Sequence, residues 1–263
     1  MLQKLNSDSN ALVPFKSANL ERLNASVEVT NRILYQRAEL YFNKGFISLN
    51  SRILDHSEIN FSREILNDPQ FPAKNKLTCE AKNYPDDYLD AINYFSKAIS
   101  SYEPYALAFN FRGFAKFALK EYEGAIEDFT RAIEIDPDFP NAHYNRGVAY
   151  SYLKEFQKAI DDYTKEIAID PDFALAYNNR GFAKYELKVY REAIEDFTIA
   201  IEIDPKYAFA YNNRGVAKCD LKKYIGAIED FTTAIEIDPN YGNAYGNLSD
   251  ATKELYDLSN DEE

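Results

Sequence analysis

Residues 174–207 read ALAYNNRGFAKYELKVYREAIEDFTIAIEIDPKY, and residues 208–241 repeat them closely as AFAYNNRGVAKCDLKKYIGAIEDFTTAIEIDPNY. Two further copies precede this pair without a gap, as residues 106–139 and 140–173. Every copy carries an Asp-Pro pair near its end, and the prolines stand 34 residues apart, at positions 137, 171, 205 and 239. A period of this length is typical of repeat proteins, in which each copy is one structural unit that packs against its neighbours.

Each copy predicts two helices joined by a turn. In residues 174–207 the small residues Ala176 and Ala183 belong to a first stripe with helical spacing, and Ala193 and Phe197 belong to a second. The second helix must end before Pro205, because proline has no N–H group and a fixed φ angle. The predicted unit is therefore helix, turn, helix, turn.

A glycine stands inside every predicted first helix, where it costs roughly 1 kcal/mol relative to alanine. We therefore expect the second helix to approach closely at this point, with an alanine facing the glycine and an aromatic ring filling the adjacent space. The glycines are Gly113, Gly147, Gly181 and Gly215, the alanines are Ala125, Ala159, Ala193 and Ala227, and the rings are Phe129, Tyr163, Phe197 and Phe231.

This unit resembles the tetratricopeptide repeat (TPR), which has a glycine in its first helix, an alanine and an aromatic residue in its second, and a proline near its end. The resemblance covers residues 106–241 and implies an all-α, right-handed α-solenoid whose first helices face a concave groove. Regular Asn-Arg-Gly steps are frequent in bacterial arrays, so the resemblance favours a bacterial protein. The chain departs from the family at the position before the glycine, where leucine is usual and Arg112, Arg146, Arg180 and Arg214 stand instead.

The chain divides into five predicted regions. They are a loose N-terminus (1–18), an irregular helical region (19–85) that contains a long excursion (46–84), a TPR array (86–241), a capping helix (242–258) and a frayed tail (259–263). The array begins with residues 86–102, which match the second helix of a degenerate repeat, and continues with the four full repeats. Two stretches are compatible with the missing first helix. KNKLTCEAKNY from Lys74 stands at the right distance before residues 86–102 but is poor in apolar residues. ILYQRAELYFNKG from Ile33, which we favour, has the apolar residues of a first helix but requires an insertion before residues 86–102.

Composition excludes several classes of function. A net charge of −13 disfavours nucleic acid as a partner, because phosphate contacts require clustered lysine and arginine. We expect no membrane span, and the first residues lack the apolar core of a secretory signal, which predicts a cytoplasmic protein. Cys79 and Cys219 lie far apart in the sequence and are interpreted as reduced structural thiols.

The search for catalytic chemistry gives no candidate. The glycines are single residues inside helices rather than a phosphate loop, and no Cys or His pair has metal-ligand spacing. His143 replaces an aromatic repeat residue and is expected to pack between helices. The acidic pairs of the second helices, such as Glu195-Asp196, are interpreted as a solvated face, with local pairing to the recurrent arginines favoured over ligand binding. We therefore predict a protein that is not an enzyme and has no cofactor or metal.

The resemblance implies a candidate peptide site on the first helices. Its predicted residues are Asn110, Phe114, Tyr144, Asn145, Asn178, Asn179, Phe182, Tyr185, Asn212, Asn213 and Asn247. One asparagine recurs in phase, at positions 145, 179, 213 and 247, and its amide could bind the backbone of an extended peptide. The alternative is that these amides tie neighbouring helices together.

The predicted function is a non-catalytic scaffold for protein–protein interactions that binds a peptide or helical segment of a partner protein in the concave TPR groove. The lysines and arginine with which chaperone-linked relatives clamp a terminal carboxylate are absent at the matching positions, so acidic C-terminal tails are disfavoured as ligands. The alternative is a structural module whose groove is filled by its own N-terminal region or by another copy in a homo-oligomer.

Overall fold

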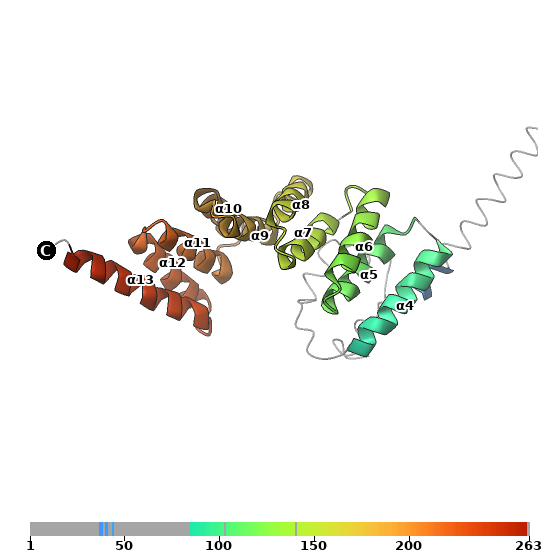
Figure 1. Cartoon of the computed structure of the whole chain (residues 1–263), viewed down its shortest axis with the longest axis horizontal. Coiled ribbons are helices and arrows are strands. Elements are labelled where there is room, and N and C mark those ends of the chain that lie inside the picture. The colour runs from blue at the N-terminus through green and yellow to red at the C-terminus, as the bar shows by residue number, and fades with distance from the viewer. Residues whose placement is uncertain are drawn as a thin grey trace, which may run out of the picture.

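The computed structural model describes residues 37, 38, 40, 41, 44, 85–102, 104–139 and 141–261. All regular structure in these residues is helical. The helices are α4 (Pro85–Ser101), α5 (Ala106–Ala118), α6 (Tyr122–Ile135), α7 (Ala142–Tyr152), α8 (Phe156–Ile169), α9 (Ala174–Glu186), α10 (Tyr190–Ile203), α11 (Ala208–Asp220), α12 (Tyr224–Ile237) and α13 (Gly242–Asp261). They follow one another along the long axis of the molecule, which confirms the predicted α-solenoid (Figure 1).

Four helix hairpins form the body of the array. They are α5–α6, α7–α8, α9–α10 and α11–α12, and each helix packs against its neighbours in sequence. Every first helix also contacts the first helix of the next repeat, as α9 does with α11, whereas second helices of successive repeats lack contacts of this extent within the described residues. The array therefore curves toward its first helices. We call the side of the first helices that faces away from the second helices the inner flank.

The predicted close approach at the glycines is confirmed. A Cβ atom added to Gly181 would lie 2.8 Å from Cε1 of Phe197 and 3.2 Å from the carbonyl oxygen of Ala193. At Gly215 the ring of Phe231 would lie only 2.6 Å from such an atom. Because real Cβ atoms essentially never approach a ring this closely, the aromatic side chain requires glycine on the facing helix.

Both helix ends of a repeat follow from local chemistry. The second helix ends at Ile203, because Asp204 after it is extended, with a φ of −124° and a ψ of 93°, and precedes Pro205. The first helix ends in a tight turn in which Lys188 has a φ of 63° and donates its N–H to the carbonyl oxygen of Tyr185 at 2.8 Å. The same left-handed turn recurs at Lys120, Lys154 and Lys222. Its recurrence fixes one hairpin geometry for the whole array.

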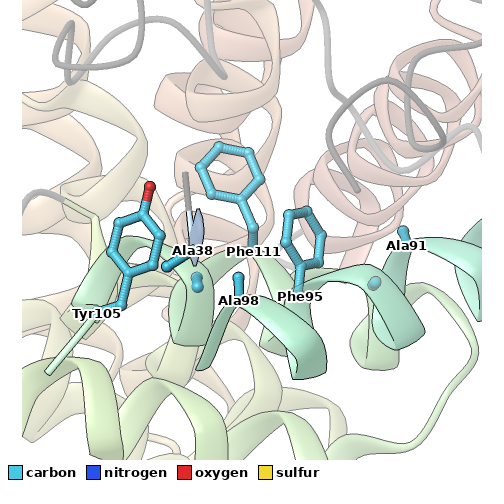
Figure 2. Close-up of a cluster of buried hydrophobic side chains, with 8 residues drawn as sticks. Ala38, Ala91, Phe95, Ala98, Tyr105 and Phe111 are labelled. Atoms are coloured by element: carbon cyan, nitrogen blue, oxygen red, sulfur yellow. The ribbon is translucent and has the colours of Figure 1, made fainter. Parts of the chain in front are cut away.

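A few residues of the stretch from Ile33 pack against α4. Arg37, Ala38, Leu40, Tyr41 and Lys44 are helical. Ala38 is fully buried in one cluster with three α4 side chains, namely Ala91, Phe95 and Ala98, as Figure 2 shows. The stretch from Lys74, the excursion 46–84, the predicted loose N-terminus 1–18 and residues 19–36 of the predicted helical region lie outside the described residues.

Helix α13 covers the C-terminal end of the array. Ala244 and Ala251 are buried against α11 and α12, and Leu248 packs beside them. The helix continues to Asp261 rather than ending at 258, because no helix-breaking residue follows Leu258. Residues 259–261, predicted as part of a frayed tail, therefore belong to the helix.

Candidate functional site

The arginine before each glycine is bound by the second helices rather than free for a ligand. Arg180 binds the carboxylate of Asp196 with two N–H groups, at 2.9 and 2.7 Å. Its remaining nitrogen, Nη1, lies 3.2 Å from the hydroxyl of Thr164 in the preceding repeat. Lys184 approaches the same carboxylate at 2.9 Å. One arginine therefore joins two helices of its own repeat and one of the repeat before it.

These contacts correct one prediction and confirm another. Asp196 is buried, so this position of the second helix is not a solvated face as we predicted. The carboxylate tolerates burial because two cations compensate its charge. Local pairing of the arginines is confirmed, and the equivalent pairs are Arg112–Asp128, Arg146–Asp162 and Arg214–Asp230.

The repeat 140–173 has a more polar interior than the others. His143 is buried with its Nδ1 atom 3.2 Å from Oδ1 of Asp162, in the structural role that we predicted. Burial alone would raise the pKa of Asp162, but hydrogen bonds from Arg146 and His143 outweigh it and lower this pKa. Glu166 is buried where other repeats have alanine, and it accepts N–H groups from Asn141 and Tyr144. Burial raises the pKa of Glu166 despite these two bonds.

The recurrent asparagines connect first helices of successive repeats. The amide of Asn213 donates to the side-chain oxygen of Asn178 at 3.1 Å, and that of Asn179 donates to the hydroxyl of Tyr144 at 3.0 Å. Two further bonds of this kind are Asn145 to Asn110 at 3.1 Å and Asn247 to Asn212 at 2.8 Å. The amides therefore do tie neighbouring helices together, which was the alternative to peptide binding.

Three predicted site residues lie inside the array. Asn110, Asn178 and Asn212 are buried, although we expected them to face the groove. The physical reason is that each of their side-chain oxygens accepts a bond from the next first helix. The donors Asn145, Asn179, Asn213 and Asn247 remain partly exposed.

Aromatic and aliphatic side chains of the inner flank are unequally exposed. Phe182 is 41% exposed on α9, and Phe209 is 53% exposed on α11. Leu175, seven residues before Phe182 and thus on the same face of α9, is 37% exposed. Leu175 and Phe209 were not among the predicted site residues, although both stand six residues before a repeat glycine, and this shared position is the signal that could have identified them.

The other predicted aromatic residues are partly covered by their neighbours. Phe114 packs against the cluster that contains Ala38, and the ring of Tyr144 lies 4.9 Å from that of Phe173. Tyr185 packs beside Phe197, and its hydroxyl interacts with Asp220 of α11. Burial first, and then the Asp220 carboxylate, raise the pKa of Tyr185. Among the phenylalanines that the structure describes, Phe182 on α9 and Phe209 on α11 are the exposed ones.

No helix of the described part of the chain combines the length and the apolar character needed to cross a bilayer. The residues that the structure places also contain no group of three His, Cys, Asp or Glu side chains that could hold a metal ion.

Comparisons with known proteins identify the repeat. Models of the TPR repeat match residues 113–154, 140–173, 174–207 and 208–241. No protein with a curated description matches the sequence. Three similar solved structures are MamA (23% identity, covering 62% of this chain and 98% of that chain, TM-score 0.57), MamA 41-end from Desulfovibrio magneticus RS-1 (18%, 68% and 97%, 0.57) and YrrB (19%, 71% and 91%, 0.55).

The YrrB structure is described as a TPR protein with an unusual peptide-binding site. At these identities the solved structures show the fold of this chain, and the repeat models match the same boundaries that its Asp-Pro period predicts. The chain belongs to the tetratricopeptide repeat family.

Proposed function

We propose that this chain is a non-catalytic scaffold that binds an extended or helical segment of another protein along its inner flank. The TPR is generally a protein-interaction module, and no catalytic family matches the chain. The observation that carries the proposal is the exposure of Phe182 and Phe209 on adjacent first helices. Large rings that remain half-exposed on a shared face are typical of surfaces that bind another protein.

The amides beside these rings favour a polypeptide as the ligand. A carboxamide has two N–H groups and an oxygen, so the bond from Asn213 to Asn178 uses one N–H of Asn213 and leaves further bonding capacity. Asn213 is partly exposed, one turn beyond Phe209 on α11. An extended segment could place apolar side chains on the rings and its backbone groups on this amide. The peptide site named for the similarly folded YrrB supports the same class of ligand.

The proposal is tested by removing the two exposed rings together. The Phe182→Ala, Phe209→Ala variant should lose capture of peptides selected by the wild-type chain from a randomised display library, while its helical circular-dichroism spectrum stays unchanged. Ile225→Ala removes an exposed apolar side chain from the second helix α12 and is the matched control. Selected peptides that bind the double variant as well as the wild type would exclude the inner flank.

The alternative, self-association through this flank in a cytoplasmic homo-oligomer, predicts a different result. In that case the molecular mass in solution should rise with protein concentration, and the double variant should remain monomeric.

A further inference from the structure

Positive charge on α9 and α11 is turned away from the inner flank. On α11, Arg214 contacts Asp230 at 2.7 Å and Lys218 contacts the same carboxylate at 2.6 Å. Arg180 and Lys184 make the equivalent contacts on α9. The cations in the second halves of both first helices are therefore compensated by buried aspartates of the second helices.

The inner flank of the same region carries carboxylates instead. Asp220 at the end of α11 and Asp250 and Glu254 on α13 are exposed. Cys219 precedes Asp220 and packs in one cluster with Leu248 and Ala251 of α13, which stand beside Asp250 and Glu254 in the sequence. Burial, followed by these three carboxylates, raises the pKa of the Cys219 thiol to about 11. None of the three forms an ion pair with another described residue. Lys253, which stands directly before Glu254 in the sequence, is the exposed lysine of α13.

The acidic region adjoins the exposed apolar side chains. Tyr185 lies one turn after Phe182 on α9, and its hydroxyl interacts with Asp220 of α11. Tyr185, on the same face of α9 as Phe182, therefore interacts with one of the carboxylates near Cys219. The position of Asp220 holds Ala118 and Tyr152 in the first two full repeats and Glu186 in the third, so it is acidic in α9 and α11 only among the four full repeats.

We propose, on the basis of the proposed function, that the inner flank of α9, α11 and α13 binds a partner segment in which lysine or arginine alternates with bulky apolar residues. The apolar side chains contact Phe182 and Phe209, and the cations lie beside Asp220, Asp250 and Glu254. Charge complementarity selects this partner, because each carboxylate without an ion pair gains a counter-charge, whereas an acidic segment would be repelled.

The test uses two labelled peptides. In the first, lysine alternates with leucine and phenylalanine, and in the second every lysine is replaced by glutamate. The full chain should bind the lysine peptide, its affinity should fall with rising salt, and the glutamate peptide should bind at least about tenfold more weakly. The Asp220→Asn, Asp250→Asn, Glu254→Gln variant should lose about tenfold in affinity for the lysine peptide.

The control variant removes the same number of charges elsewhere. Glu195→Gln, Glu202→Gln and Glu229→Gln neutralise three exposed carboxylates on α10 and α12 and should leave the affinity unchanged. An equal loss in this control would overturn the proposal, because net charge alone would then explain binding. A second variant replaces Lys74, Lys76 and Lys82 of this chain by glutamine. A gain in its affinity for the lysine peptide would also overturn the proposal, because these lysines of the same chain would then be the occupant of the flank instead of a partner.

Failure of this inference can be distinguished from failure of the proposed function. If library peptides that require Phe182 and Phe209 prove neutral or acidic, the partner class is wrong and the scaffold function stands. If no selected peptide depends on these two rings, both proposals fail.

Discussion

The two sides of the first helices obey different rules. Toward the second helices the same residues recur in every repeat, such as Gly181 and Arg180 in α9, and they are buried or ion-paired. On the inner flank the residue after the glycine changes, from Phe114 to Val148 and from Phe182 to Val216. The comparison teaches that packing fixes the side that repeats, whereas the residue after the glycine varies on the side where we propose that a partner binds.

The largest expected difference between the two sides is in the free energy of unfolding after truncation of two phenylalanines of one repeat. Phe197→Ala should lower the free energy of unfolding by about 3–5 kcal/mol, because the ring is buried against Gly181 and its removal leaves a cavity. Phe182→Ala should change it by no more than about 0.5 kcal/mol, since that ring is exposed. Urea unfolding followed by circular dichroism measures both. Equal losses would remove the distinction between the two sides.

A smaller effect is expected from the charged contact. Arg180→Ala should cost roughly 2–3 kcal/mol, because Asp196 stays buried with Lys184 as its remaining cation and Thr164 of the preceding repeat loses the bond that Arg180 donates. Arg191→Ala, an exposed arginine of α10, is the control and should be nearly neutral. Similar unfolding midpoints for the two variants would show that the buried pair contributes no net stability.

The asparagine contacts between first helices should contribute less. Asn213→Ala removes one amide bond to Asn178 and should lower the free energy of unfolding by about 1 kcal/mol. Asn243→Ala, on the exposed surface of α13, is the matched control. Because Asn213 also lies on the inner flank, a loss of peptide binding without a loss of stability would show that its amide acts mainly on the ligand.

The smallest expected effect is a pH dependence confined to the repeat 140–173. The pKa of Glu166 is raised above its ordinary value of 4.5, so the folded state holds this proton more tightly than the unfolded state. Its contribution to stability is therefore fully present below pH 4.5 and is lost as the pH rises through the folded-state value. Each unit of difference between the two pKa values corresponds to about 1.4 kcal/mol.

The measurement compares wild type with Glu166→Ala, which introduces the residue found at Ala132 and Ala200 of other repeats. The free energy of unfolding of the wild type should gain relative to the variant as the pH falls from 7 toward 4.5. Parallel pH profiles would contradict the raised pKa.

Sequence reasoning succeeded where each feature had a local cause that recurred. The glycine opposite Phe197 and the helix end before Pro205 could be predicted because sterics forbid the alternatives. It failed for Asp196, whose exposure cannot be predicted from helical spacing alone, because its burial depends on Arg180 from another helix. It also left the amide of Asn213 with two possible roles.

The sequence by itself therefore determined the repeat, its two helices and the residues that pack between them, since these follow from periodicity and steric exclusion. The tertiary structure decided which polar side chains form hydrogen bonds or ion pairs within the array. Bonds such as Asn213 to Asn178 join residues of different repeats, and their formation depends on how one hairpin is rotated against the next. The stacking also leaves Phe182 and Phe209 exposed on adjacent first helices, because exposure is a property of the stacked array rather than of any single helix.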